Sequence, residues 1–358
     1  MNNKTTDPSE ALGLVICDIT ARDDLFSPRF VSPDEVEQAK DAIAAQSRPE
    51  MDDAFIRYSV SLSPASVRVS HRFPGAVGKP ANYKAKSAIG GWSRKSRAAM
   101  VARLCSLDYS EMLADPARPP AMITLTYPSD WEAVVPDGNT AKRHLRAFQK
   151  RYQRSFGVSL RAIWKMEFQR RGAVHFHLFC VPPRGVKFRS WLSENWTDIV
   201  SPPDPDERIK HQKAGTGLDY ETGLRSYDAK RVAVYFSKHG SANYGDKEYQ
   251  NTPPDEWIAA GSVGRFWGYW HLCPSISTVE ICEDDALFVA RVLRRWARAN
   301  SKARRVVVWR TNQRTGEIYK RAVRRRPRRL TGRSGFVAVN DGSAMGRSLA
   351  RALTARLR

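Results

Sequence analysis

Two short apolar runs joined by a polar turn constrain the fold of this 358-residue chain most strongly. Residues 164–168 and 173–179 are rich in aromatic and aliphatic side chains, and they flank the polar segment 169–172. Runs of this length and composition favour strands, and the short connection favours an antiparallel hairpin. If the hairpin is centred near Arg171, Glu167 pairs with His175, because each lies four residues from the centre.

The second run carries two histidines, His175 and His177, at alternate positions. Side chains on a strand alternate between faces, so both imidazoles project from the same face. Directly opposite residues on paired strands share a face about 5 Å apart, which adds the Glu167 carboxylate to the pair. Two neutral nitrogen ligands and one carboxylate favour a divalent metal site. Two alternatives stay open: the histidines form a structural or surface pair, or Glu167 forms an ion pair with Arg170 or Arg171.

The net charge of +22 and the isoelectric point near 10.1 indicate a polyanionic partner, most often nucleic acid. Residues 1–53 hold 12 acidic against 5 basic residues, a balance of −7, whereas residues 291–358 hold 21 basic against 2 acidic, a balance of +19. Arg304–Arg333 also contains Trp309 and Tyr319, so this segment is suited to following a phosphate backbone and stacking on bases. The alternative is a basic end that only improves solubility. Residues 1–60 are expected to form an acidic flexible segment.

Five scattered cysteines, Cys17, Cys105, Cys180, Cys273 and Cys282, contain no paired spacing typical of a zinc ribbon or a disulfide framework. The sequence shows neither a signal peptide nor a long apolar run, and it lacks a P-loop motif. We therefore expect a reduced, cytoplasmic protein without an ATPase domain of its own.

The remaining pattern predicts an α+β fold with a central antiparallel sheet of about five strands flanked by helices. Helices are expected at 33–46, 93–113, 139–156, 191–196, 227–238 and 284–298, and strands at 67–73, 121–127 and 275–282. A basic hairpin is expected at 305–311 and 318–323. Residues 201–223 are expected to form a polar loop, and the chain from 324 to form no regular structure before a weak basic helix at 344–357. Trp191, Trp196, Trp267 and Trp270 are interpreted as core residues.

Tyr235 and Lys238 lie at positions i and i+3 of the expected helix 227–238, so they face the same way. An ammonium beside a phenol favours the phenolate, which a nucleophile requires. Two alternatives stay open here. Lys238 is an ordinary solvated lysine, or Tyr244, which has the same spacing to Lys247, is the nucleophile.

Taken in order, these segments resemble the HUH superfamily of rolling-circle replication initiators. Ile123–Pro128 looks like the first motif of that superfamily, Glu167–His177 like the metal-binding motif, and Val234–Lys238 like the motif of the catalytic tyrosine. Further similar stretches are Ser93–Arg97, Lys247–Asn251 and Gly264–Gly268. The resemblance covers roughly residues 87–285, and we expect a nicking domain at 61–285 followed by a DNA-binding or disordered basic segment at 286–358.

The resemblance implies a metal-dependent endonuclease and strand transferase. His175, His177 and Glu167 would hold Mg²⁺ or Mn²⁺, and Tyr235, supported by Lys238, would attack single-stranded or hairpin origin DNA to give a 5′-phosphotyrosine and a free 3′-OH. A host helicase and a host polymerase are the expected partners. Thr124 and Thr126 are expected to line the floor of the site.

One departure and two competing readings accompany the resemblance. Some initiators carry a second tyrosine four residues before the first, and that position is Arg231 here, so how the reaction ends stays open. The competing readings are a relaxase or single-tyrosine transposase with the same chemistry, and a non-catalytic DNA-binding regulator.

Overall fold

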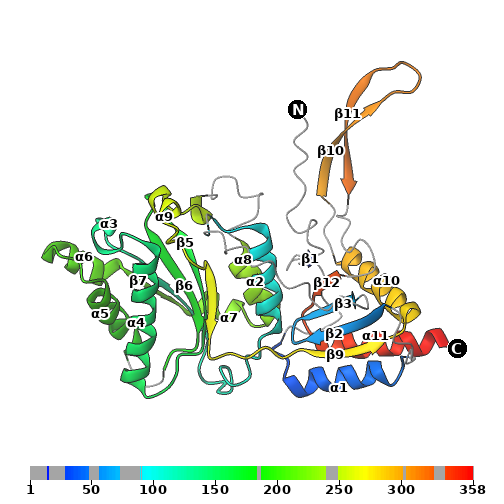
Figure 1. Ribbon diagram of the computed structural model, residues 1–358, viewed down its shortest axis with the longest axis horizontal. Helices are drawn as coiled ribbons and strands as arrows, with labels where there is room; N and C mark the ends of the chain where they lie inside the picture. Colours follow the sequence, from blue (N-terminus) through cyan, green and yellow to red (C-terminus); the bar gives the residue numbers. More distant parts are fainter. Residues whose placement is uncertain are drawn as a thin grey trace. The chain divides into compact units, whose positions relative to one another are not determined.

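The computed structural model describes residues 14–15, 29–47, 56–72, 89, 91–183, 187–238, 249–300, 304–325 and 335–357. The chain divides into two compact units (Figure 1). The first consists of Met1–Pro28, Pro33–Ala76 and Ile276–Arg358, and the second of Arg29–Ser32 and Val77–Ser275.

A five-stranded sheet forms the centre of the second unit. Its strand order is β7-β4-β6-β5-β8, and every neighbouring pair is antiparallel. The strands are β4 (Ala121–Leu125), β5 (Ala162–Phe168), β6 (Val174–Cys180), β7 (Thr216–Asp219) and β8 (Trp267–Trp270). This sheet and its helices confirm the expected α+β class. The expected hairpin is formed by β5 and β6, and its register places Glu167 opposite His175, as predicted.

Helices cover both faces of this sheet. Figure 1 shows α4 (Gly138–Phe156) and α5 (Phe188–Val200) on one side, and α2 (Arg94–Ser106) and α8 (Ala229–Lys238) on the other. The Asp137 side chain caps α4 by accepting from the Thr140 N–H, and Gly157 ends the helix at a φ of 68°. Leu145, Phe148 and Tyr152 form the buried face of α4, which confirms the amphipathic helix expected there.

Three expectations for this unit were wrong. Residues 201–223 are not an irregular loop, because they contain α6 (Pro205–Ala214), β7 and the start of α7 (Tyr220–Arg225), and Asp204 and Asp219 cap the two helices. Helix α2 ends at Ser106 rather than near 113, since Leu107 turns extended and bridges to Pro274. Trp267 and Trp270 are half-exposed on the edge strand β8, whereas Trp196 is fully buried as expected. The short helices α3 (Trp131–Val134) and α9 (Asp255–Ala259) complete the elements of this unit.

The first unit contains another five-stranded sheet, in the order β1-β12-β3-β2-β9. Its strands are β1 (Leu14–Val15), β2 (Arg57–Ser63), β3 (Ser66–Arg72), β9 (Ser277–Ile281) and β12 (Gly335–Ala338), and its helices are α1 (Pro33–Ala44), α10 (Glu283–Ala299) and α11 (Gly342–Leu357). Strand β12 was not expected, because a four-residue strand within an Arg/Gly/Ser-rich stretch has too short a pattern to detect. The expected boundaries near residues 60 and 285 both fall inside this unit.

Burial explains why both ends of the chain contribute to the first unit. Val36, Ala39 and Ile43 of α1 have no exposed surface, and Leu349 and Leu353 of α11 are 1% exposed. A Cβ atom at Gly346 would lie 2.8 Å from the Cβ of Ala39, so the two helices pack closely at this point. Burial of these apolar faces stabilises α1 and α11 as parts of one core.

Strands β10 (Arg304–Thr311) and β11 (Ile318–Arg325) pair with each other in a two-stranded antiparallel sheet, as expected for the basic hairpin. The exposed fractions of its apolar side chains are high, 64% for Trp309, 59% for Val307 and 67% for Ile318. Within the described part of the chain, no helix has the length and apolar character that crossing a membrane requires.

Candidate metal centre

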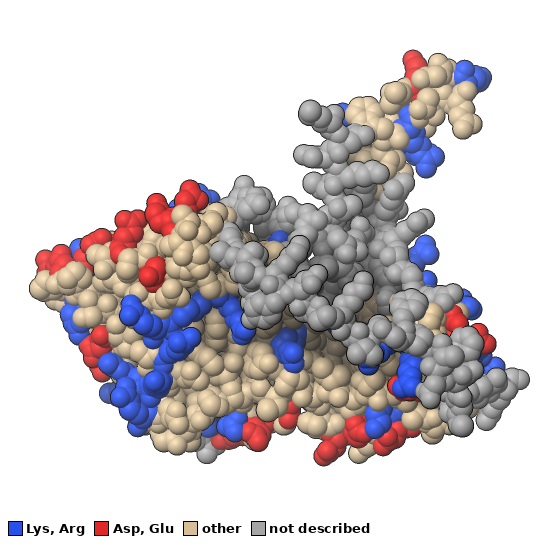
Figure 2. All heavy atoms as spheres, viewed as in Figure 1, with Lys and Arg blue, Asp and Glu red and all other residues tan. Residues whose placement is uncertain are grey.

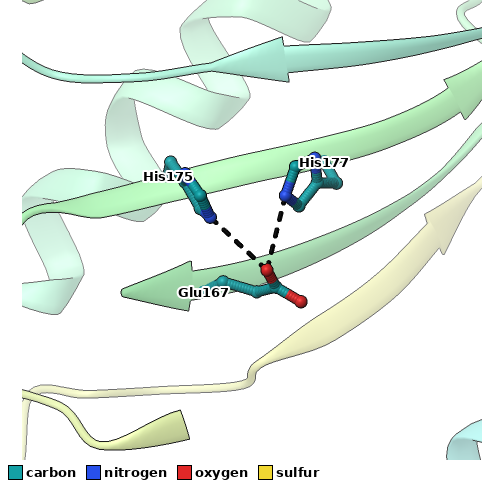
Figure 3. Close-up of side chains that lie close together, drawn as sticks. All are labelled: Glu167, His175 and His177. Atoms are coloured by element: carbon teal, nitrogen blue, oxygen red, sulfur yellow. Dashed lines mark hydrogen bonds and ion pairs between the residues drawn. The ribbon is translucent and has the colours of Figure 1, made fainter. Parts of the chain in front are cut away.

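Glu167, His175 and His177 meet on one face of the β5–β6 hairpin (Figure 3). The Nε2 atoms of His175 and His177 each lie 3.4 Å from Oε2 of Glu167, and the two rings are 4.7 Å apart between centroids. One ligand atom from each residue falls within 4.8 Å of the other two. Both histidines come from β6 and the carboxylate comes from β5, so the sheet register sets this arrangement.

Thr124 orients His177 from the neighbouring strand. It lies opposite His177 in the β4–β6 pairing, and its Oγ1 is 3.1 Å from Nδ1 of the imidazole. When Nδ1 carries the proton and donates it to Thr124, Nε2 keeps the lone pair that a metal ligand needs. Thr126, in contrast, donates to the carbonyl of Gly215, so the two threonines differ in role.

Lys165 is a member of the site that sequence reasoning missed. Its ammonium forms an ion pair with Oε1 of Glu167, and the side chains of the two residues are only 1% and 2% exposed. The signal was present, because the register that pairs Glu167 with His175 also pairs Lys165 with His177. The ion pair holds one oxygen of Glu167 and leaves the other facing the imidazoles.

The electrostatics keep the three candidate ligands in the forms that bind a metal. Burial alone raises the pKa of Glu167, but hydrogen bonds with both histidines and the charge of Lys165 lower it below its usual value, so the carboxylate is ionised. Burial lowers the pKa of His175, although Glu167 opposes this effect, so the ring is neutral at neutral pH.

The donor set fits a divalent ion. Atoms bound to one ion at about 2.0–2.2 Å lie roughly 3–3.6 Å from one another, and the two nitrogen-to-oxygen distances of 3.4 Å fall within this range. Imidazole and carboxylate ligands together suit borderline cations such as Mn²⁺, and carboxylates suit Mg²⁺. Residues His175, His177 and Glu167 are thus able to hold such an ion with little movement.

The alternative in which Glu167 pairs with an arginine was wrong. Arg171 donates to the carbonyls of Tyr127, Pro128 and Ser129. The guanidinium of Arg170 lies 5.6 Å from the ring centre of Tyr249. The turn at 169–172 is instead fixed by backbone bonds and by Gly172 at a φ of 84°.

Tyr235 lies on α8, a helix that Figure 1 shows on the α2 side of the sheet. Val232, Ala233 and Phe236 form the buried face of α8, and Tyr235 is half-buried beside them. Burial raises the pKa of Tyr235, and the charges of Glu167 and Asp219 raise it further, so the phenol lies within the electrostatic reach of the metal-centre carboxylate. This direction is opposite to the activation expected from Lys238. The side chain of Lys238, and Tyr244 with Lys247, lie outside the described residues.

Arg231 occupies the position of the second tyrosine found in some initiators, and its contacts are structural. Its Nε lies 3.4 Å from Asp228, and its guanidinium lies 4.4 Å from the ring centre of Tyr227. Asp228 also accepts from the Arg231 N–H, which caps the first turn of α8. Arg231 therefore helps to begin the helix that carries Tyr235.

Comparison with known proteins first gives a class. The family of the replication-associated protein ORF2 matches residues 120–239, about a third of the chain. This range contains β4, β5, β6 and α8, and so the metal-centre residues and Tyr235.

A particular relative extends the likeness. Over 231 residues the chain is 28% identical to a replication-associated protein of Pseudomonas phage Pf3, a stretch that covers 61% of this chain and 72% of the phage protein. No solved structure matches the chain.

Proposed function

We propose that this protein is a replication initiator that nicks single-stranded origin DNA with Tyr235 and the metal centre, as members of the HUH superfamily do. The similarity to replication-associated proteins supports the initiator role. The observation that carries the nicking step is the convergence of His175, His177 and Glu167, with Tyr235 within reach of the Glu167 charge. All four residues lie in the range that the family matches.

The proposed reaction is a transfer of the phosphoryl group to a tyrosine. A divalent ion, Mg²⁺ or Mn²⁺, supplies a Lewis acid for the scissile phosphate when it is bound by His175, His177 and Glu167. Oη of Tyr235 bonds to phosphorus while the bond between phosphorus and the 3′ oxygen breaks. The phenol loses its proton and the 3′ oxygen gains one, which leaves a 5′-phosphotyrosine and a free 3′-OH.

The raised pKa of Tyr235 sets a requirement on this step. The phenol is protonated at neutral pH, so attack on phosphorus needs positive charge near its oxygen. We propose that Lys238, three residues later on α8, contributes this charge. With one tyrosine on the helix and Arg231 held by Asp228, the closing step needs water, an acidic side chain or a second protomer.

The free 3′-OH is the proposed link to the host. It can prime a host polymerase, and a host helicase is needed to open the duplex because the sequence has no P-loop motif. The same chemistry in a relaxase or a transposase would use a different DNA substrate, whereas a non-catalytic regulator would bind DNA without cutting it.

Basic surfaces support DNA as the substrate. Figure 2 shows Lys and Arg gathered over α4, and Asp and Glu gathered along the edge formed by α3, α6 and α9. The exposed basic residues of α4 are Arg143, Arg146, Lys150 and Arg154. The β10–β11 hairpin holds eight basic residues and one acidic residue in 304–325, and we propose it as a further contact with phosphates.

The test is formation of a covalent adduct. The purified protein is incubated with a labelled single-stranded oligonucleotide library and Mn²⁺, with and without EDTA, and run on a denaturing gel beside Tyr235→Phe and Tyr244→Phe. A metal-dependent adduct that only Tyr235→Phe abolishes is expected. Tight DNA binding without an adduct on any sequence would identify a regulator, and loss in Tyr244→Phe alone would move the nucleophile.

A further inference from the structure

A groove with a volume of about 1190 Å³ lies along the edge strand β8 of the second unit. The first turns of α2 form one wall, and β8 with the residues before it forms the other. The lining residues are Ile89, Gly91, Trp92, Ser93, Ser96, Arg103, Trp164, Arg265, Phe266, Trp267, Gly268, Tyr269 and Trp270. Pockets that enclose drug-sized ligands measure about 300–1,000 Å³, so the groove has room for more than one nucleotide.

The groove ends beside the metal centre. Nζ of Lys165 lies 4.3 Å from the ring centre of Trp92, and the same ammonium pairs with Glu167. Trp267 is directly opposite Lys165 in the β5–β8 pairing. A strand that occupies the groove would therefore lead towards the residues proposed to bind the scissile phosphate.

Aromatic rings dominate β8. Three of its four residues, Trp267, Tyr269 and Trp270, are aromatic and half-exposed. The fourth, Gly268, leaves space for the ring of Trp164, since a Cβ atom there would lie 2.6 Å from that ring. The Trp164 and Trp270 rings are 6.4 Å apart between centroids, which gives the groove several flat apolar surfaces.

The charge of the groove is positive. Arg103 and Arg265 line it, Arg265 is exposed, and among the described lining residues none is acidic. Helix α4, with its exposed basic side chains, lies beside the end of β8, because Gln149 is 3.4 Å from His271. Aromatic faces combined with arginines are typical of grooves that bind single-stranded nucleic acid.

We propose that this groove binds the bases of single-stranded DNA next to the nicking site. Bases stack on Trp267, Tyr269 and Trp270, and Arg103 and Arg265 contact the backbone. The proposal deepens the proposed function and rests on it for the identity of the strand. It also replaces the interpretation of Trp267 and Trp270 as core residues.

The test measures DNA binding without cleavage. Full-length protein carrying Tyr235→Phe is titrated in EDTA against a fluorescent oligonucleotide of about 12 nucleotides, within the site sizes known for such grooves. Trp267→Leu and Trp270→Leu are each expected to weaken binding about tenfold, because a base stacked on an aromatic ring loses that contact. Trp270→Phe keeps an aromatic face and is expected to bind nearly as well as the parent.

A matched control exists on α5. Trp191 is half-buried and donates its indole N–H to Ser155 at 3.1 Å, much as Trp267 donates to Ser96 at 3.3 Å. Trp191→Leu removes an equivalent ring and bond away from the groove, so its affinity for DNA is expected to stay unchanged. An oligonucleotide without bases is expected to bind the parent and the groove variants equally.

The outcomes separate the groove from the nicking reaction. Unchanged affinity in folded Trp267→Leu and Trp270→Leu overturns the groove proposal, even if the adduct with Tyr235 forms. Weakened binding without any adduct from the unmodified protein supports the groove and contradicts the nickase. If the leucine variants fail to fold, the exposed-residue variant Arg265→Glu decides, since unchanged affinity in it overturns the proposal. An equal loss on duplex DNA also overturns it.

Discussion

The ammonium of Lys165 and the carboxylate of Glu167 form a buried ion pair at the centre of the candidate metal site. With both histidines neutral, the positive and negative charges of this pair cancel. A divalent cation therefore enters a site without net negative charge. Lys165 stabilises the carboxylate while the metal is absent and repels the metal when it arrives.

Removal of this lysine should have two opposite effects. Lys165→Met leaves the Glu167 carboxylate buried without its cation, which is expected to lower the free energy of unfolding by about 3–5 kcal/mol in EDTA. The same variant is expected to bind Mn²⁺ more tightly, because the repelling charge is gone. Thermal unfolding in EDTA and in a Mn²⁺ series measures both effects.

Lys142→Met is the matched control for this prediction. Lys142 is also a largely buried lysine, but it lies against Met166, Trp164 and Phe176 on the other face of the sheet. Its replacement is expected to leave Mn²⁺ affinity unchanged. An equal Mn²⁺ affinity in Lys165→Met and the parent protein would show that Lys165 does not act on the site.

The bond between Thr124 and His177 makes a second prediction. Thr124→Val removes the hydroxyl that fixes the ring, so Mn²⁺ affinity is expected to fall by about 10- to 100-fold while the fold is retained. Thr126→Val serves as the control, because its hydroxyl bonds to Gly215 and not to a ligand. Calorimetric titration with Mn²⁺ compares the two, and equal losses would exclude an orienting role for Thr124.

The hairpin of the metal centre could be predicted from sequence because local information sets it. A short turn and a period of two fix which residues face each other, and these rules gave the Glu167–His175 pair. The same rules contained the Lys165–His177 pair, but a lysine inside an apolar strand contradicts ordinary burial preferences and was passed over. The contact of Thr124 with His177 needed the β4–β6 register, which no local pattern specifies.

The rest of the fold depended on contacts between distant segments. Strand β12 pairs with β3 across more than 260 residues, so nothing near it in the sequence marks it as a strand. The exposure of Trp267 and Trp270 follows from β8 being the edge of its sheet. Composition alone assigns tryptophan to the core, because it cannot tell an edge strand from a central one.

Lys142 makes a prediction about pH. Burial lowers its pKa from 10.5 to about 7, so the unfolded chain binds a proton between these values that the folded protein does not. Stability should therefore rise with pH in this window, by up to about 1.4 kcal/mol per pH unit. The difference in free energy of unfolding between the parent and Lys142→Met, measured at pH 7, 8 and 9, is expected to shift in favour of the parent. A difference independent of pH would contradict the lowered pKa.

The β10–β11 hairpin makes the last prediction, on salt. An isolated two-stranded hairpin with exposed Trp309 and Ile318 gains little from its own packing, which favours a role in contact with a polyanion. If the basic segment makes about six phosphate contacts, DNA affinity should fall about 10³-fold between 50 and 200 mM salt.

Two variants divide this effect between charge and stacking. Replacing Arg310, Arg314 and Arg321 by alanine should make the dependence of log affinity on log salt shallower by up to about 2.7, because each lost phosphate contact contributes about 0.9. Trp309→Ala removes an exposed ring without changing charge, so it is expected to weaken binding with the slope preserved. Anisotropy titrations at four salt concentrations give both slopes, and an unchanged slope in the triple variant would remove these arginines from the DNA contact.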